Sequence, residues 1–218
     1  MLAEASRILK ELQRLRYWPK LFVLVGPSGV GKTSLCRLAV KTRGNLSYAI
    51  SATTRAPRPG ERDGQDYYFL SLEEFLAKKA RGEFIETTRI YNSYYGLLRH
   101  ELEGKLQKGQ SVIMDLDIRG LIHLKAYYRA QAVGIFILPP SIKELHKRYL
   151  ARREARDENP AVRLYALSAE LGWLKQELSR PKPRVDYVLI NKELGASVQN
   201  LIQLIKHEEQ RIIGGGKV

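Results

Sequence analysis

Short apolar runs alternate along this chain with longer stretches in which apolar residues recur every three or four positions. The apolar runs cover residues 21–25, 111–117, 133–138 and 185–191. Runs of this length with few polar interruptions are typical of strands that are buried on both faces. The stretches with helical spacing cover residues 33–41, 98–108, 142–153, 162–179 and 196–211. Strands that alternate with helices in this way predict an α/β fold, with a parallel sheet and helices on both of its faces.

The stretch 48–95 departs from this alternation. Short strand patterns at 67–70 and 84–90 lie on either side of one helical pattern. Ser71 and Glu74, three residues apart, form the capping box that begins that helix. These features predict a small mixed α+β insert between elements of the core.

The two ends of the chain have their own patterns. Residues 2–16 have the spacing of an amphipathic helix, which Pro19 ends. Glu4 and Lys10 interrupt the apolar region that a secretory signal needs. The glycine-rich tail 214–218 is expected to be disordered.

The composition narrows the class of protein. The chain has 218 residues, of which 44% are hydrophobic and 28% charged, and these values exclude disordered and fibrous proteins. Its apolar runs are far shorter than the roughly 20 residues that a membrane span needs. The single cysteine, Cys36, cannot form an internal disulfide, which is typical of a reducing compartment. We therefore expect a cytoplasmic protein.

The charge balance is strongly basic. Lys plus Arg number 37 against 23 Asp plus Glu, a formal net charge of +14. Such a charge attracts polyanions, which include nucleotides, nucleic acids and membrane surfaces. The basic residues are spread along the chain, so charge alone does not choose among these partners.

A phosphate-binding loop follows the first apolar run. The sequence GPSGVGKT matches G-x-x-x-x-G-K-[ST] and stands between a strand pattern and a helix pattern, the context that a P-loop requires. Its glycines let backbone N–H groups converge on phosphate oxygens, and the helix N-terminus adds a positive dipole. Lys32 can reach the β- and γ-phosphates, and the Thr33 hydroxyl can ligate Mg²⁺. The residues expected to bind the triphosphate are Gly26, Pro27, Ser28, Gly29, Val30, Gly31, Lys32, Thr33 and Ser34.

Two aspartates end the second apolar run. Asp115 and Asp117 are expected at the carboxyl edge of the sheet, where ligands of α/β proteins collect. Either carboxylate can hold Mg²⁺ through water or accept hydrogen bonds from an acceptor substrate. The alternative interpretation is a strand end that is merely exposed to solvent.

Basic residues in the insert form a second candidate phosphate site. Arg55 and Arg58 flank a turn that proline stiffens, so that two guanidinium groups can bind one phosphate. Tyr67 and Tyr95 follow, and their hydroxyls can add donors. The alternative is a polar loop with scattered basic residues.

A third group of arginines lies in the second half of the chain. Arg148, Arg152 and Arg156 recur every four residues, and Arg163 follows a polar loop. Such a run is typical of a solvated helix face. The functional alternative is a lid of arginines that closes on a phosphoryl group in transfer.

No cluster of His and Cys with the spacing of metal ligands is present in the sequence, and no nucleophile elbow. The four histidines are His100, His123, His146 and His207. Catalysis is therefore expected to depend on positioning and electrostatics, without a covalent intermediate.

Taken together, these motifs resemble those of the guanylate kinase family in order and approximate spacing. They are GPSGVGKTS, SATTRAPRPGERDGQDYYF, EFIE, NSYYG, VIMDLD, IFILPPS and VLIN. The resemblance covers about residues 20–208, so the N-terminal helix lies outside it. It implies a P-loop NTPase core with an enzyme activity, the Mg²⁺-dependent transfer of the ATP γ-phosphoryl group to GMP, giving ADP and GDP.

The resemblance also implies a division of the chain. A core would comprise 20–47, 98–140 and 166–218, with a GMP-binding insert at 48–97, a helical lid at 141–165 and an N-terminal extension at 1–19. The partners would be ATP and GMP, and the protein would be a monomer or a homodimer. Neither a membrane nor a specific nucleic acid is expected, although the charge leaves nucleic-acid binding as a side activity.

Roles for single residues follow from the same resemblance. The GMP phosphate would be bound by Arg55, Arg58, Tyr67 and Tyr95. Guanine would be read by Ser51, Glu86 and Asp117, with the Glu86 carboxylate accepting from the N1–H and the 2-amino group. Adenine has no such donors and would leave a buried carboxylate unpaired.

The remaining implied roles concern ATP and the transferred phosphoryl group. Asp115 and Thr33 would be linked to Mg²⁺, and Asn191 would lie near the ATP adenine. The catalytic residues would be Lys32, Arg148, Arg152 and Arg163.

The sequence departs from the family pattern at three places, of which Thr33-Ser34, the reverse of the more common Ser-Thr order, keeps a metal-ligating hydroxyl. Leu97 stands where the family usually has Ser or Thr, whose hydroxyl contacts guanine. We expect weaker GMP binding or relaxed base choice, because one hydrogen bond contributes about 0.5–1.5 kcal/mol. Lys192 stands where the family usually has aspartate.

Two other functions stay open at this point. One is an inactive binding module with the same fold, but such domains typically have an eroded P-loop, whereas Lys32 and Thr33 are present here. The other is a related kinase of a different phosphorylated acceptor, such as a sugar phosphate. Glu86 and Asp117 favour guanine instead.

Overall fold

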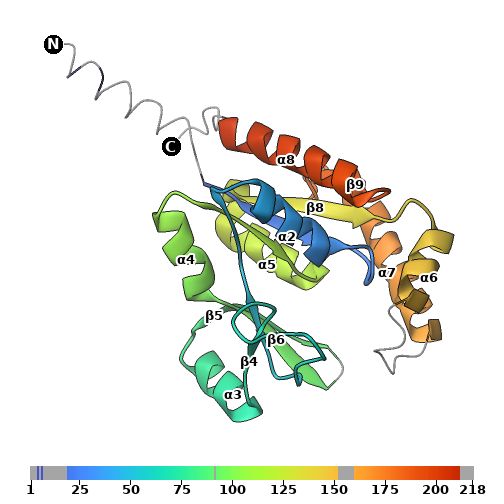
Figure 1. Ribbon diagram of the computed structural model, residues 1–218, viewed down its shortest axis with the longest axis horizontal. Coiled ribbons are helices and arrows are strands. Elements are labelled where there is room, and N and C mark those ends of the chain that lie inside the picture. Colours follow the sequence, from blue (N-terminus) through green and yellow to red (C-terminus); the bar gives the residue numbers. More distant parts are fainter. Residues whose placement is uncertain (1–3, 5, 7–18, 91, 152–159, 212–218) are drawn as a thin grey trace.

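A parallel sheet forms the core of the protein (Figure 1). The computed structural model describes residues 4, 6, 19–90, 92–151 and 160–211. Its five core strands all run parallel, in the order β2-β7-β1-β8-β9. They are β1 (Leu21–Val25), β2 (Leu46–Tyr48), β7 (Ser111–Asp115), β8 (Ala132–Leu138) and β9 (Tyr187–Ile190). The predicted parallel α/β fold is therefore confirmed, and β2 is an additional edge strand that three residues are too few to predict.

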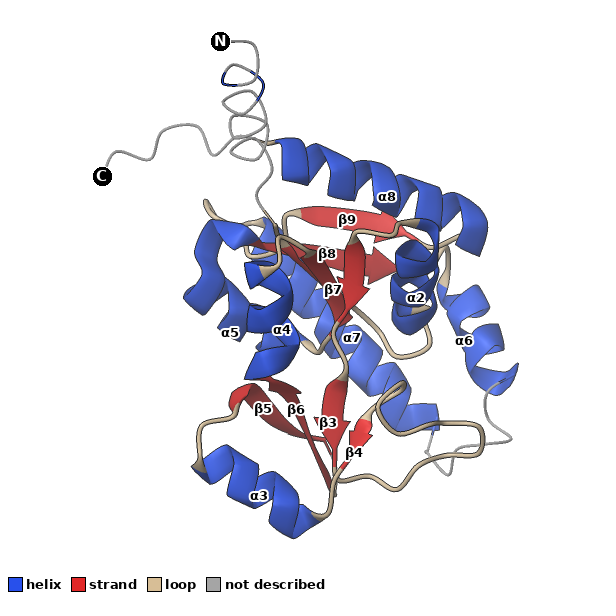
Figure 2. Cartoon of the chain, turned by 60° about the vertical axis from the view of Figure 1, so that its left-hand side comes forward, coloured by secondary structure: helices blue, strands red, loops and turns tan. Residues whose placement is uncertain are grey.

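Helices cover both faces of this sheet (Figures 1 and 2). On one face lie α2 (Lys32–Thr42) and α8 (Leu194–Gln210), which pack against each other. The other face is covered by α4 (Arg99–Gln107) and α5 (Ile118–Tyr128), joined by Leu174 of α7 (Pro160–Leu178). Helix α6 (Ile142–Ala151) follows β8 and adds Leu145 to the first face, and a short 3₁₀ turn (Arg129–Gln131) precedes β8.

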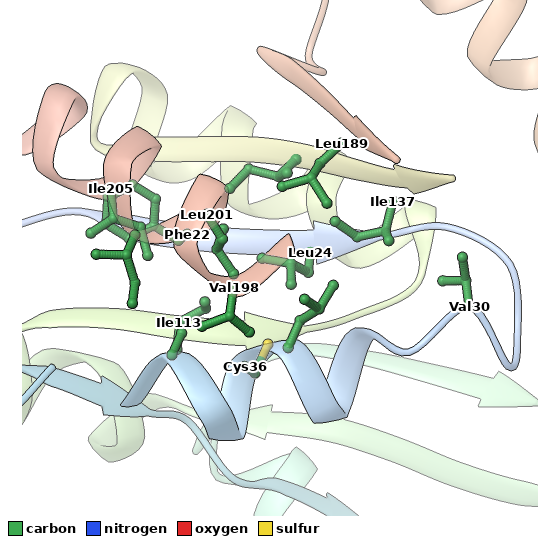
Figure 3. Close-up of a cluster of buried hydrophobic side chains, with 14 of the residues drawn as sticks. Phe22, Leu24, Val30, Cys36, Ile113, Ile137, Leu189, Val198, Leu201 and Ile205 are labelled. Atoms are coloured by element: carbon green, nitrogen blue, oxygen red, sulfur yellow. The ribbon is translucent and has the colours of Figure 1, made fainter. Parts of the chain in front are cut away.

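Alternation along β1 divides the core into two clusters. Phe22 and Leu24 point to the α2 and α8 side, where Cys36 and Leu201 meet them (Figure 3). Leu21, Val23 and Val25 point to the opposite side, toward α4 and α5. Every residue of β1 is fully buried, which explains why its sequence is a continuous apolar run.

The insert contains a second sheet of four strands in the order β4-β3-β6-β5 (Figure 2). Its elements are β3 (Ser51–Thr53), β4 (Tyr68–Phe69), α3 (Leu72–Ala80), β5 (Phe84–Ile90) and β6 (Ser93–Leu98). The pairings of β3 with β6 and of β6 with β5 are antiparallel, and that of β3 with β4 is parallel. A small separate cluster of Ala52, Phe75, Phe84 and Leu98 fills its centre. The sheet is mixed, as the sequence predicts.

The spacing of Ser141 and Glu144 predicts a second capping box besides Ser71–Glu74, and the two differ in outcome. Both hydrogen bonds of the Ser71–Glu74 box are present at the start of α3. At the start of α6 the Ser141 hydroxyl accepts from the Glu144 N–H at 3.1 Å, but the Glu144 carboxylate accepts instead from Arg148. The second box is therefore only half formed among the described residues.

The predicted strand 111–117 is two residues too long. Strand β7 ends at Asp115, and Asp117 is the N-cap of α5, where its Oδ1 accepts from the Gly120 N–H at 2.7 Å. Helix α5 itself has no counterpart among the predicted helices. Its buried residues Leu121 and Leu124 are spaced for a helix, but the preceding apolar run obscures its start.

Some expectations concern residues that the structure does not describe. The predicted N-terminal helix 2–16 and the tail 214–218 lie outside the described residues. Among the helices that are described, none has both the length and the apolar character that crossing a bilayer would require.

A buried polar cluster fixes the end of the sheet where β1 begins. The Lys20 ammonium donates to Glu208 Oε2 at 2.8 Å, and the Tyr187 hydroxyl donates to Glu208 Oε1 at 2.6 Å. Burial opposes ionisation of this carboxyl, but the hydrogen bonds from Lys20 and Tyr187 prevail and lower the pKa of Glu208 to about 2. The cluster ties α8 to β1 and β9.

Replacing Gly134 in β8 tests how tightly this core is packed. A Cβ at this position would lie 2.5 Å from the Arg184 carbonyl oxygen and 2.8 Å from Leu121 Cδ1. We expect Gly134→Ala to lower the free energy of unfolding by about 1–3 kcal/mol, measured by urea denaturation. The control is Gly104→Ala in α4, where a Cβ would meet no atom within 4 Å, and which should raise stability by about 0.5–1 kcal/mol. Equal stability of the two variants would contradict this account.

Candidate active site

The phosphate-binding loop fits against the end of the sheet because two of its residues have no side chain. Gly26 and Gly31 have φ angles of +132° and +99°. A Cβ on Gly26 would lie 2.4 Å from the Ile137 carbonyl oxygen, and one on Gly31 would lie 2.6 Å from Asn191 Nδ2. The loop therefore requires glycine at both positions, for conformation and for space.

Lys32 is the first residue of α2 and lies over this loop. Its ammonium donates to the Gly26 carbonyl at 2.5 Å and to the Pro27 carbonyl at 3.1 Å. The positive charge is thus held at the N-terminus of α2, where free backbone N–H groups and the helix dipole also favour an anion.

The Asn191 side chain is hydrogen-bonded to the backbone of the phosphate-binding loop. It follows β9, is 3% exposed, and donates from Nδ2 to the Val30 carbonyl at 2.8 Å. Its Oδ1 is buried without a hydrogen-bond partner in the described part of the chain. Sequence reasoning places this residue near adenine, whereas the contact that the structure provides is with the loop backbone.

Asp115 stands at the end of β7 with a donor on each carboxylate oxygen. The Thr33 hydroxyl donates to Oδ2 at 2.7 Å, and the Tyr48 hydroxyl donates to Oδ1 at 2.5 Å. Burial, together with the nearby Asp115 charge, raises the pKa of the Tyr48 phenol, which therefore stays a donor. The sequence motifs give no indication of the contact from Tyr48.

The donor set around Asp115 suits magnesium. A hydroxyl and a carboxylate are hard oxygen donors, which Mg²⁺ prefers, and this ion usually keeps several waters and uses few protein ligands. No group of three or more His, Cys, Asp or Glu residues that could hold a metal occurs among the described residues. A cage made wholly of such protein side chains is therefore absent from this part of the chain.

On the insert side, Glu61 holds both candidate phosphate-binding arginines. Its carboxylate accepts two hydrogen bonds from Arg55 Nη2, at 2.9 and 2.8 Å, and one from the Arg58 backbone N–H at 2.8 Å. The Arg55 guanidinium lies 5.5 Å from the centre of the Tyr67 ring, which in turn packs edge-on against Tyr95. Arg55, Tyr67 and Tyr95 therefore lie together as predicted, and the Arg58 backbone is tied to the same carboxylate. Sequence reasoning assigned no role to Glu61.

Three strands bring two of the three predicted guanine-reading residues, Ser51 and Glu86, into one row. Ser51 of β3 pairs with Leu97 of β6, and Leu97 pairs with Glu86 of β5. The Glu86 carboxylate is 9% exposed and makes no hydrogen bond within the described residues. Burial, followed by the charge of Asp117, raises the pKa of Glu86 to about 8. Asp117 also accepts from the Thr88 hydroxyl at 3.3 Å, besides capping α5.

A further carboxylate, Glu170 of α7, faces the same region. Its Oε2 is buried and has no hydrogen-bond partner among the described residues. Burial raises the pKa of Glu170, the charge of Lys32 lowers it, and the charge of Asp117 raises it further. In the sequence it is one polar position of a helical pattern, and nothing there distinguishes it.

The predicted lid arginines are only partly described. Arg148 donates from Nε to Glu144 at 3.1 Å and from Nη2 to the Lys192 carbonyl at 3.1 Å. Arg152 lies outside the described residues, and of Arg163 only the helical backbone is described. Only the Arg148 side chain can be placed, so the lid of arginines stays a prediction.

Polar contacts connect the insert to the core. Arg37 of α2 forms an ion pair with Asp66 at 2.5 Å, next to Tyr67. The Glu101 carboxylate of α4, which is 6% exposed, accepts from the Ile50 N–H, the Tyr68 hydroxyl and the Lys105 ammonium at 3.1, 2.7 and 2.6 Å. These contacts fix the segment in which the chain leaves β2 and enters β3.

Comparison with known proteins agrees with this geometry. A family model described as guanylate kinase matches residues 18–208. The chain belongs to the guanylate kinase family. The guanylate kinase of Thermotoga maritima is 35% identical over 193 residues, which are 88% of this chain and 89% of that protein. That of Symbiobacterium thermophilum is 38% identical over 196 residues, which are 90% of this chain and 89% of that protein.

A solved structure supports the same assignment. The crystal structure of guanylate kinase from Anaplasma phagocytophilum matches with a TM-score of 0.72 at 29% identity, covering 89% of this chain and 88% of that chain. The resemblance inferred from the motifs is thereby confirmed, as is the fold class of guanylate kinases.

Leu97 of β6 lies between Ser51 of β3 and Glu86 of β5 in the row described above. It is fully buried and packs with Ile85 and Leu102 in the cluster on the α4 and α5 side. An apolar side chain therefore fills the position at which the family usually has a hydroxyl.

Restoring a hydroxyl at position 97 should strengthen GMP binding. We expect Leu97→Thr to lower the KM for GMP about 2- to 10-fold, since one hydrogen bond contributes about 0.5–1.5 kcal/mol, and to lower the melting temperature through lost apolar volume. The matched control is Leu98→Thr, on the other face of β6, where Leu98 packs with Phe84. It should lower the melting temperature without improving the KM. An unchanged KM in Leu97→Thr would refute the role of this position.

The raised pKa of Glu86 predicts a pH dependence of stability. Between about pH 4.5 and pH 8 the unfolded chain releases this proton while the folded chain keeps it, so stability must fall as the pH rises through this window. We expect Glu86→Gln to remove this slope when the free energy of unfolding is measured in urea from pH 5 to pH 8.

The control for this experiment is Glu83→Gln. Hydrogen bonds from Lys78 and Arg81 lower the pKa of Glu83, so its contribution changes only below about pH 4.5. Its curve should therefore run parallel to that of the wild type from pH 5 to pH 8. A parallel curve for Glu86→Gln would show that Glu86 does not hold its proton in the folded protein.

Proposed function

We propose that this chain transfers the γ-phosphoryl group of ATP to GMP, producing ADP and GDP. The observation that carries the proposal is Glu86, a mostly buried acceptor without a hydrogen bond among the described residues, in the same row as Ser51. Guanine offers two adjacent donors, its N1–H and 2-amino group, from which the Glu86 carboxylate accepts hydrogen bonds once it has released its proton. Adenine presents neither at that edge and would leave the carboxylate unpaired.

Each substrate has its own set of residues in this proposal. ATP is bound by Gly26, Pro27, Ser28, Gly29, Val30, Gly31, Lys32, Thr33 and Ser34, with Asn191 supporting the loop. Ser51, Glu86 and Asp117 bind guanine, and Arg55, Arg58, Tyr67 and Tyr95 bind the GMP phosphate. The ion pair with Glu61 holds Arg55 ready, so that less side-chain entropy is lost when the phosphate arrives.

The chemical step requires charge neutralisation and alignment. An oxygen of the GMP phosphate attacks the γ-phosphorus, and the bond to the bridging oxygen breaks, so that the electron pair leaves with ADP. Lys32 donates to the β- and γ-phosphates after leaving the loop carbonyls, and Arg148, Arg152 and Arg163 are proposed to stabilise the charge in transfer. Thr33 and Asp115 would hold Mg²⁺, which when bound neutralises charge on the phosphates.

The location in the cell is part of the same proposal. We place the reaction in the cytoplasm, where ATP and GMP are available and where a single reduced cysteine, Cys36, is expected to persist.

Turnover with different acceptors tests this function. We expect ADP to form from Mg-ATP with GMP and dGMP, and far more slowly with AMP, CMP or UMP. Lys32→Met should abolish turnover. Glu86→Gln should lower kcat/KM for GMP about 100-fold, because its amide presents a donor to the guanine donors. The control, Glu83→Gln, should leave kcat/KM for GMP unchanged.

The other outcomes identify the alternatives. Binding of GMP without turnover would indicate an inactive binding module. Turnover with none of these acceptors and no binding of GMP would indicate a kinase of another phosphorylated compound.

A further inference from the structure

The hydrogen bond between Tyr48 and Asp115 joins the two halves of the site. Tyr48 is the last residue of β2 and Asp115 the last residue of β7, and the two strands are parallel neighbours. The phenol donates to Oδ1 of Asp115 at 2.5 Å, while Thr33 donates to Oδ2 at 2.7 Å. Each carboxylate oxygen therefore has one donor, from a different element, and the plane of the carboxylate is fixed from two sides.

The position of the Tyr48 ring does not depend on Asp115. Its backbone pairs with Ile113, and the ring packs against the hydrophobic cluster on the α2 and α8 side. Its carbonyl accepts from the Lys105 ammonium at 2.9 Å, and Lys105 in turn is paired with Glu101. A donor whose backbone and ring are both held in this way is preorganised, so it can orient Asp115 at little entropic cost.

The orientation of the Asp115 carboxylate is important because the protein supplies few ligands to the Mg²⁺ ion. Mg²⁺ requires nearly ideal octahedral geometry, which a rotating carboxylate does not offer. Hydrogen-bond partners of metal-linked groups fix that geometry, and their removal typically lowers metal affinity about 10- to 100-fold.

We propose that Tyr48 is a positioning residue for the magnesium-linked carboxylate of Asp115, and that it connects the start of the insert to the phosphate-binding loop. The inference rests on the proposed function, because that function assigns Asp115 to Mg²⁺. Tyr48 touches neither substrate in this account and acts only through Asp115.

The test measures ADP binding by calorimetry, with excess Mg²⁺ and separately with EDTA. In the wild type, Mg²⁺ should tighten the binding of ADP. Tyr48→Phe removes only the hydroxyl and should lose about 10-fold of this tightening, while its affinity in EDTA stays within about twofold of the wild type. The free Mg²⁺ needed for half-maximal turnover should rise, with the KM for GMP unchanged.

Tyr187→Phe is the matched control. It removes a tyrosine hydroxyl that also donates to a carboxylate, Glu208, at the distant end of the sheet where β1 begins. This variant should lose thermal stability and keep the full effect of Mg²⁺ on ADP affinity. A purely structural role for Tyr48 would give the same pattern in Tyr48→Phe and would overturn the proposal.

Asp115→Asn separates the failure of this inference from failure of the proposed function. If Asp115→Asn loses the effect of Mg²⁺ and Tyr48→Phe keeps it, only the role of Tyr48 is refuted. If Asp115→Asn keeps the effect, or if the wild type shows none, the assignment of Asp115 to Mg²⁺ is wrong and the inference falls with it. A loss of ADP affinity in EDTA equal to that in Mg²⁺ would also refute the role of Tyr48.

Discussion

The close approach of the phosphate-binding loop to the end of the sheet is the constraint on which the rest of the site depends. Gly26 touches the end of β8 and Gly31 touches Asn191, at distances that leave no room for a Cβ. This contact sets where α2 begins, and hence where its N–H groups and Lys32 point. It also brings Thr33, the second residue of α2, within hydrogen-bond distance of Asp115 on a neighbouring strand.

The parallel sheet extends this arrangement to the acceptor side. Strands β1, β7 and β2 all end at one edge, so the loop, Asp115 and the exit into the insert lie side by side. In the insert, the pairing of β3, β6 and β5 aligns Ser51 and Glu86 in a single row across the three strands. Glu101 and the Arg37–Asp66 pair hold that second sheet against the core. One edge of the core sheet thus brings together the residues proposed to bind ATP and those proposed to bind GMP.

Local signals made much of this predictable. The fully buried β1, the glycine-rich loop and the capping box of α3 are encoded in short stretches, so the sequence alone indicates them. Strand β2 and helix α5 escaped prediction because one is very short and the other begins directly after an apolar strand. Asp117 was expected at a strand end and is instead a helix N-cap, since β7 ends two residues earlier.

Partners supplied by packing could not be predicted at all. Which elements pack together determines three features of the site, and spacing along the chain does not reveal it. They are the hydrogen bonds between Glu61 and Arg55, the hydrogen bond between Tyr48 and Asp115, and the burial of the Glu170 carboxylate.

The small hydrophobic cluster of the insert has an evolutionary consequence. Ala52, Phe75, Phe84 and Leu98 form a cluster separate from the two clusters of the core. Substitutions on the α3 side of the insert can therefore be compensated locally, without disturbing the core. Leu97 and Ile85 pack instead in the core cluster that contains Val23 of β1. Selection can thus change the α3 side of the insert separately, whereas a change at Leu97 also alters the packing of the core.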